Sequence, residues 1–387
     1  MRSRLLRHVN MLREFSVPLI CGVLLALFWA NLNPAEYLRA VNAPFVGSFS
    51  LHFISNDLFM VFFFGIAAVE ITQSFLPGGS LSPVSRAINP LMATLGGVIG
   101  PVIVYLVLNV LFGSPVLNRG WGIPTATDIA LAWLVARLIF GASHPAVSYL
   151  LLLAVADDAI GLGIIAVFYP DPSHPVSPVW LCLTILGMLT AYGLRRVSVM
   201  SYWPYLFLGG VLSWTGLFMA HLHPALALVF ILPFLPGQPR AAKGLFEENP
   251  DDRSPLSNFE HEWKIIVDFG LFMFGMTNAG VEFSSLGTAT WLVVSALIAG
   301  KSIGVFGMGY AASLFGMQLP HGMRRRDLLV VGLIAGIGFT VALFIAGEAF
   351  IEGSIRSAAK MGAILSILAA LIAVFVAGSM GVKKVRE

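Results

Sequence analysis

The chain has 387 residues, of which 57% are hydrophobic and only 11% are charged. Soluble domains carry about 25% charged residues, so this composition excludes an ordinary soluble protein and indicates a membrane protein with several spans. The net charge of +3 is small and its Lys and Arg residues are scattered, which argues against nucleic-acid binding.

Twelve apolar runs resemble membrane-spanning helices, each of which needs roughly 20 apolar residues. We therefore predict an all-α membrane protein in which residues 1–387 form one polytopic transmembrane domain. The eighth run is the shortest. The expected spans are 15–32, 55–75, 89–112, 119–140, 146–169, 177–194, 202–220, 222–236, 263–281, 289–315, 327–347 and 357–381.

Lys and Arg in short loops predict the orientation, because they are enriched on the cytoplasmic side. With twelve spans both termini would be cytoplasmic, and the N-terminal segment has no small-residue cleavage pattern that would remove it. The predicted cytoplasmic side holds Arg2, Arg4, Arg7, Arg13, Arg195, Arg196, Arg240, Lys243, Arg324, Arg325, Arg326, Lys383, Lys384 and Arg386. The opposite side holds Arg39, Arg119, Arg356 and Lys360.

The fourth and eleventh spans contain residues that interrupt a helix. Pro124 precedes Thr127 in the fourth, and Gly336 and Gly338 precede Thr340 in the eleventh. Non-helical backbone at membrane depth survives only where it is buried or lines a cavity. If spans three to five and ten to twelve are inverted repeats, both interrupted spans are middle members, which is the pattern of a transporter binding site.

Few ionisable side chains fall in the middle of a span: Asp128, Asp157, Asp158 and Lys301, with Glu70 and Glu348 nearer the ends. A carboxylate at membrane depth is costly unless it is paired or faces water. Adjacent helical residues point about 100° apart, so Asp157 and Asp158 require different partners. We expect one to pair with Lys301, and the other to bind a proton or a metal ion. The alternative is that the Asp–Lys pair only stabilises the fold and takes no part in function.

Five segments, "TATDIALA", "ADDAIG", "NAGV", "GKSIG" and "GIGFT", occur in an order and at spacings that resemble the NhaA family of bacterial sodium/proton antiporters. The resemblance extends from Asn56 and Asp57 to about position 350. It implies crossed, broken fourth and eleventh spans and exchange of Na⁺ or Li⁺ for H⁺. It assigns Asp157 and Asp158 as the two carboxylates of the ion-binding site, and Asp128 and Thr127 to the broken helix. Lys301 would face these residues, and Glu70 and His223 would take part in the pH response.

The chain departs from this family pattern at three places, one of which is the segment "FMFGMT" before "NAGV". Thr72, Gln73 and Ser74 replace charged residues that follow the second-span glutamate and are linked to pH sensing in the family. Glu348 replaces a residue that is usually apolar.

These observations together predict a secondary transporter in the bacterial inner membrane, which expels Na⁺ and Li⁺ in exchange for external H⁺ and needs no cofactor. The lipid bilayer is its expected surroundings, and a hairpin at 38–53 would pair two subunits. A sodium-coupled organic-anion symporter would require a mid-span Arg, which is absent. An intramembrane aspartyl protease, with two carboxylates sharing a proton, would carry Y-D and G-x-G-D motifs on separate helices, and both motifs are absent. The interrupted helices favour alternating access over a permanent channel.

Overall fold

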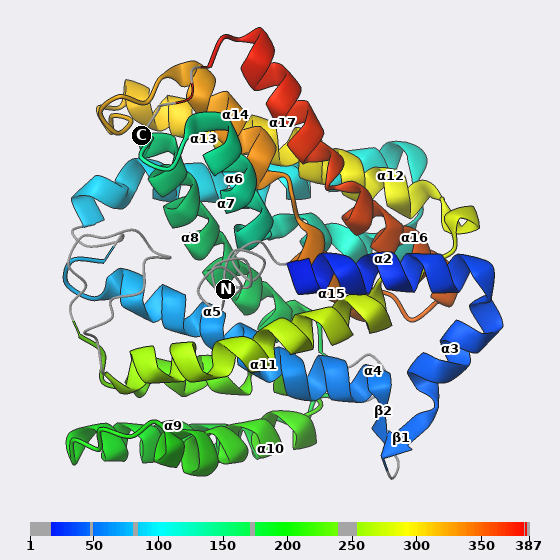
Figure 1. The fold of residues 1–387 in the computed structure, drawn as a ribbon, viewed down its shortest axis with the longest axis vertical. Coiled ribbons are helices and arrows are strands. Elements are labelled where there is room, and N and C mark those ends of the chain that lie inside the picture. Colours follow the sequence, from blue (N-terminus) through cyan, green and yellow to red (C-terminus); the bar gives the residue numbers. More distant parts are fainter. Residues whose placement is uncertain are drawn as a thin grey trace, which may run out of the picture. The chain divides into compact units, whose positions relative to one another are not determined.

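The structure is a computed structural model that describes residues 17–46, 49–79, 84–170, 175–238, 254–382 and 384. Helices make up most of it, with one short ladder of two strands (Figure 1). The chain forms two compact units, each assembled from distant stretches of sequence. Of the described residues, residue 17 and those within 84–161 and 281–384 belong to the first unit, and those within 18–79 and 162–280 belong to the second.

Six described helices are long and apolar enough to cross a membrane. Two further pairs of helices qualify when each is taken together, but they bend by 55° and 44° at a short break. The six are Leu51–Phe75, Ala87–Phe112, Pro145–Phe168, Pro178–Arg196, Thr288–Leu314 and Gly353–Ser379, and the bent pairs are Pro115–Thr125 with Ile129–Phe140 and Arg325–Ala335 with Phe339–Ala349.

In their described residues all twelve expected segments contain helical structure, but only eight of them match helices or bent pairs long and apolar enough to cross a membrane. The first and seventh expected spans contain shorter helices, Val17–Leu32 and Tyr205–Met219. The eighth and ninth also differ. The eighth consists of two short 3₁₀-helices, η5 (Pro224–Phe230) and η6 (Leu232–Phe234), both with Pro in their first turn. The ninth, α11 (Pro255–Asn278), begins eight residues earlier than expected. Its start is fixed by the Ser254 hydroxyl, which accepts the Ser257 N–H, and by Pro255 in the first turn.

Glycines bring two helices of the first unit into close contact. They are α6 (Val84–Phe112) and α13 (Lys301–Leu314). A Cβ on Gly100 would lie 2.5 Å from the Gly300 carbonyl oxygen, and one on Gly96 would collide with the Gly304 backbone. Gly96, Gly97 and Gly100 therefore form a series of small residues that lets the two helices pack closely. This contact fixes the start of α13, where Lys301 lies.

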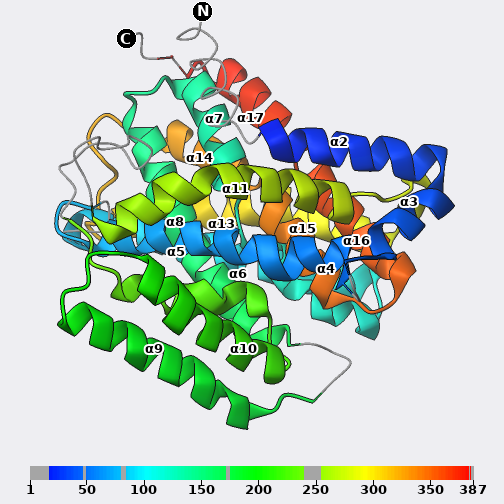
Figure 2. The ribbon, with the colours of Figure 1, turned by 60° about the horizontal axis from the view of Figure 1, so that its bottom comes forward.

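In the second unit, α11 packs beside α5 (Met60–Phe75), and α9 (Leu181–Arg196) beside α10 (Val211–Met219), as Figures 1 and 2 show. Aromatic rings fill the first of these interfaces. Phe62 stacks on Trp263 with ring centroids 4.0 Å apart, and Phe59 meets Phe269 edge to face. Apolar and aromatic side chains thus hold α5 against the helix that ends at the "NAGV" segment.

The segment between the first two expected spans contains the predicted hairpin. β1 (Pro44–Val46) pairs antiparallel with β2 (Phe49–Ser50), with Pro44 opposite Ser50 and Val46 opposite Phe49. It follows α3 (Pro34–Asn42), whose Tyr37 hydroxyl donates to the Met276 carbonyl at 2.9 Å. Burial raises the pKa of Tyr37 above its ordinary value, so the hydroxyl stays a neutral donor.

Several positive charges used to predict orientation lie outside the described residues: Arg2, Arg4, Arg7, Arg13, Arg240, Lys243, Lys383 and Arg386. Those that are described include Arg195 and Arg196 in the last turn of α9, and Arg324 to Arg326 at the start of α14 (Arg325–Ala335).

Candidate functional site

The first bent pair breaks at the residues that the sequence singled out. The 3₁₀-helix η2 (Pro115–Thr125) ends one residue after Pro124, and α7 (Ile129–Phe140) begins directly after Asp128. Asp128 Oδ1 caps α7 by accepting the Leu131 N–H at 3.0 Å. A carboxylate at a helix N-terminus is favoured because the helix dipole is positive there.

The second bent pair breaks between α14 and α15 (Phe339–Ala349), at Gly336, Ile337 and Gly338. A Cβ on Gly336 would lie 2.7 Å from the Leu297 carbonyl oxygen, so the close approach of the backbone requires glycine there. The Asp128 N–H donates to the Ile337 carbonyl at 2.7 Å. Asp128 Oδ2 accepts the Thr340 N–H at 3.3 Å and the Thr340 hydroxyl. Asp128 therefore joins the two breaks.

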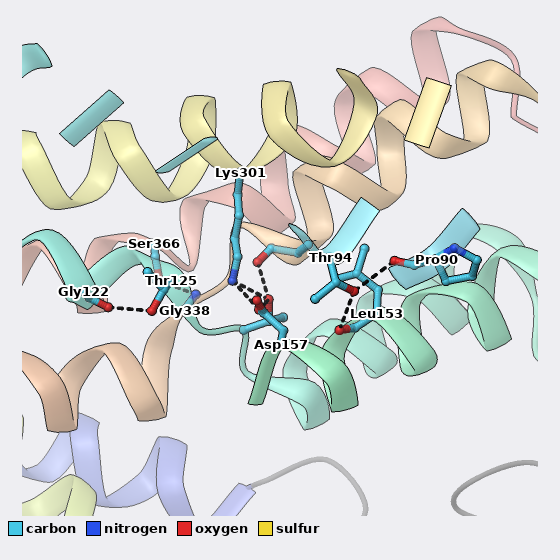
Figure 3. A network of polar contacts seen from close by, with 11 residues as sticks. Pro90, Thr94, Gly122, Thr125, Leu153, Asp157, Lys301, Gly338 and Ser366 are labelled. Carbon is cyan, nitrogen blue, oxygen red and sulfur yellow. Dashed lines mark hydrogen bonds and ion pairs between the residues drawn. The ribbon is translucent and has the colours of Figure 1, made fainter. Parts of the chain in front are cut away.

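Lys301 and Asp157 form a buried ion pair beside these breaks (Figure 3). Lys301 Nζ lies 2.5 Å from Asp157 Oδ2, and both side chains are 0% exposed. Asp157 comes from α8 (Pro145–Phe168). Of the six described helices that are long and apolar enough to cross a membrane, this one has the largest share of buried residues in its apolar window, 72%. The expected pairing of a mid-span aspartate with Lys301 is present.

The Thr127 hydroxyl completes this ion pair. Its Oγ1 accepts from Lys301 Nζ at 2.7 Å, and lies 2.8 Å from Asp157 Oδ2 and 2.9 Å from the Ala335 carbonyl oxygen. A hydroxyl has a single proton, so it donates to one of these two oxygens at a time. If the charge of Asp157 changes, the Thr127 hydroxyl can thus rotate and donate either to the Asp157 carboxylate or to the Ala335 carbonyl of the second bent pair.

Asp158 follows Asp157 on α8 and is also buried, at 8% exposure. It interacts electrostatically with Lys301. Among the described residues no three His, Cys, Asp or Glu side chains gather as a metal site. A hard cation held by these carboxylates would therefore draw its remaining oxygen ligands from hydroxyls, backbone carbonyls or water.

Glu70, His223 and Glu348 occupy other parts of the fold. Glu70 lies in α5 and His223 directly before η5, both in the second unit, whereas the ion pair belongs to the first. Glu348 lies in the last turn of α15 and interacts electrostatically with Lys360 of α16 (Gly353–Leu365). It is not at the break of its own helix pair.

The residues that replace the charged cluster after Glu70 have ordinary partners. The Thr72 and Ser74 hydroxyls donate to the carbonyls of Ala68 and Glu70, one turn earlier on α5. Gln73 Nε2 donates to Glu260 Oε2 of α11 at 2.9 Å. A neutral amide therefore binds the α11 carboxylate at this position.

The N-terminus of α8, which carries both aspartates, is capped by a histidine. His144 Nδ1 accepts the Ala146 N–H at 3.1 Å, and the ring stacks on Phe140. Burial lowers the pKa of His144, while the negative charge of Asp327 partly raises it. The neutral form, with its proton on Nε2, is the one that can cap α8.

Sequence reasoning missed three features. Asp268 is an ionisable residue well inside α11. Asn278 Nδ2 donates to Asn56 Oδ1 at 2.7 Å, which joins the "NAGV" and "ND" segments in the second unit. The Ser366 hydroxyl accepts backbone N–H groups at the second break. The position of Asp268 within an expected span was a signal for the first, whereas the other two depend on long-range contacts.

Buried carboxylates and one lysine, held by helix breaks inside a membrane protein, define a secondary transporter of small cations. Comparison with known proteins agrees. A Na⁺/H⁺ antiporter 1 family model matches residues 9–378. The Na⁺/H⁺ antiporter NhaA 2 of Pelobacter propionicus is 65% identical, covering 98% of this chain and 99% of that protein. The Na⁺/H⁺ antiporter NhaA of Desulfitobacterium hafniense is 63% identical, covering 98% of each.

The solved structure of the sodium proton antiporter MjNhaP1 from Methanocaldococcus jannaschii gives a TM-score of 0.48 at 16% identity, covering 96% of this chain and 98% of that one. The chain belongs to the Na⁺/H⁺ antiporter 1 family. It is thus a multi-pass inner-membrane transporter of Na⁺ and H⁺ and not an enzyme.

Proposed function

We propose that the chain expels Na⁺ in exchange for external H⁺ by letting both compete for Asp157 and Asp158. The observation that carries this proposal is the fully buried ion pair of Lys301 and Asp157, with a second buried carboxylate next to it. The two carboxylates carry two negative charges and Lys301 carries one positive charge, so a proton or Na⁺ would balance the net charge of these three groups. Without either, their net negative charge at membrane depth would oppose movement of the site across the membrane.

In this proposal Asp128, Thr127 and Thr340 form the frame of the site. Asp128 keeps the two breaks together through both of its carboxylate oxygens, and Thr127 links Asp157 to the Ala335 carbonyl. A cation arriving at Asp158 would attract Asp157 and weaken its bond to Lys301. The freed backbone carbonyls at the breaks would supply further oxygen ligands.

The proposal includes an arrangement of the chain in the membrane. The chain would have twelve spans with inverted repeats, crossed broken helices in the fourth and eleventh spans, and both termini in the cytoplasm. The protein needs no cofactor and acts as one transport domain in the lipid bilayer. The β1–β2 hairpin would pair two subunits, and Glu70 and His223 would take part in a pH response.

Physiologically, this activity would serve sodium and pH homeostasis, with Li⁺ as a second substrate. Li⁺ and Na⁺ are hard monovalent cations that suit carboxylate and carbonyl oxygens, whereas K⁺ is larger and needs a wider shell.

Proton movement in everted membrane vesicles tests the proposal. Vesicles are acidified inside by respiration and followed with a pH-sensitive dye, and Na⁺, Li⁺ or K⁺ is then added separately. Na⁺ and Li⁺ should each release protons, and K⁺ should not. An equal response to K⁺, or none to Na⁺ when the protein is present in the membrane, would refute it. Vesicles containing Asp158→Asn at the same protein level are the matched control and should not respond.

A further inference from the structure

The N-terminus of α15 is buried: Phe339 and Thr340 are each only 3% exposed. The first N–H groups of a helix have no partner within the helix, and at membrane depth each needs another acceptor. The N-cap residue is Gly338, which has no side chain to serve this purpose. Two other side chains provide the acceptors. Asp128 Oδ2 accepts the Thr340 N–H, and Ser366 Oγ accepts the N–H groups of Gly338 and Phe339 at 3.2 and 3.3 Å.

Ser366 is well placed to act only as an acceptor toward α15. It is 0% exposed and lies between α16 and α17 (Leu368–Ser379). Its hydroxyl proton is used by the Ala363 carbonyl oxygen at 2.6 Å. The lone pairs of Oγ are therefore left to accept the two N–H groups. Figure 3 includes Ser366 and Gly338.

The N–H groups that Ser366 accepts determine which N–H groups remain for the two carboxylate oxygens of Asp128. Because Ser366 takes Gly338 and Phe339, Asp128 Oδ2 is left with Thr340, and Oδ1 is left to cap α7 at Leu131. Without the Ser366 hydroxyl, two N–H dipoles would be unpaired beside Asp128. The carboxylate would then be drawn toward them and away from its cap on α7.

We propose that Ser366 is a positioning residue for the ion site: its hydroxyl holds the α15 N-terminus and thereby sets the place of Asp128 and the electrostatic potential that a cation meets. This inference rests on the proposed site at Asp157, Asp158 and Asp128. Removing the hydroxyl makes the potential at the break more positive, which opposes Na⁺ binding. Since Ser366 does not touch the exchanged ions, the maximal rate should change less than the affinity.

The test compares three variants in proteoliposomes: Ser366→Ala, Ser366→Thr, and Ser213→Ala as the matched control. Ser213 is also 0% exposed, but its hydroxyl donates to the Ala227 carbonyl and serves no helix break. Ser366→Ala should raise the apparent KM for Na⁺ by about threefold to tenfold, the range expected for helix-terminal charge effects, with kcat within about twofold. Ser366→Thr should restore most of the affinity, and Ser213→Ala should leave KM unchanged.

Two results would overturn the proposal. One is a parental KM in Ser366→Ala, even with a lower melting temperature, because the hydroxyl would then be merely structural. The other is an equal rise of KM in Ser366→Ala and Ser366→Thr. If Ser366→Ala does not reach the membrane, Ser366→Cys takes its place, since a thiol is a weaker acceptor of similar size. Asp158→Asn is measured in parallel: full exchange there would refute the ion site itself, whereas its loss with a parental Ser366→Ala would refute only the role of Ser366.

Discussion

Lys301 is the residue on which the charge balance of the site depends. Its ammonium group meets Asp157 Oδ2 at 2.5 Å and the Thr127 hydroxyl at 2.7 Å, and it is fully buried. Two opposite charges at membrane depth are tolerable only as a pair. Removing one partner leaves the other uncompensated, which typically destabilises a protein by about 3 to 5 kcal/mol.

We therefore expect Lys301→Ala to lower the free energy of unfolding by about 3 to 5 kcal/mol and to impair exchange. Lys301→Arg keeps the charge and should be clearly more stable than Lys301→Ala. It should still exchange poorly, because the larger, planar guanidinium cannot reproduce the contacts of the compact ammonium group with both Asp157 and Thr127. Thermal unfolding in detergent and Na⁺-dependent proton flux would be measured for both. Parental stability and flux in both variants would show that Lys301 neither neutralises Asp157 nor takes part in transport.

At the scale of single elements, the start of α8 should respond to pH. His144 caps this helix through Nδ1, faces Asp327 at the N-terminus of α14, and stacks on Phe140. Arg326 places a positive charge beside Asp327, with its Nε 3.9 Å from Asp327 Oδ1. Burial lowers the pKa of His144 below its ordinary value of 6.5. A lowered pKa means that the folded state binds the proton less well than the unfolded chain, so stability is present above about pH 6.5 and is lost as the pH falls below it.

His144→Asn tests this expectation, because an asparagine can cap a helix at any pH. The melting temperature of the parent should fall between pH 7 and pH 5 by more than that of the variant. His321→Asn, at an exposed position, is the control and should follow the parent. If the His144→Asn curve runs parallel to that of the parent over this range, the cap does not carry the pH dependence.

The elements differ in how far the sequence could predict them. Long apolar runs predicted the six helices and two bent pairs that are long and apolar enough to cross a membrane, because the thickness of a bilayer sets the length of a spanning helix. A pair between Lys301 and one of the two adjacent aspartates was predictable too, since a buried charge needs a partner and only one lysine lies at mid-span. That the partner is Asp157 comes from the structure. The Ser366 contact was not predictable, because a single serine in an apolar run has no pattern and its acceptor role depends on Gly338, 28 residues away. The eighth expected span contains two 3₁₀-helices at 224–234, and the proline in the first turn of each was a sequence signal that a single α-helix would not form there.

For the whole molecule, the predicted orientation in the membrane can be tested most simply. The Lys and Arg bias predicts that both termini are cytoplasmic, which requires an even number of spans. A reporter that is active only in the cytoplasm, fused after residue 387, should therefore be active. A fusion in the segment at 171–174 should be inactive, since that loop is expected outside. An inactive C-terminal fusion with an intact transporter would break the count of twelve and the inverted repeats with it.

Competition between Na⁺ and H⁺ for the same carboxylates is the central claim, and proton release on Na⁺ binding measures it directly. Calorimetric titration of the purified protein with Na⁺, in two buffers of different ionisation enthalpy, separates the heat of proton release from the heat of binding. The account predicts that Na⁺ binding releases protons, that its apparent affinity falls as the pH is lowered, and that Asp158→Asn removes both effects in a folded protein. Na⁺ binding without proton release, with an affinity independent of pH, would contradict it.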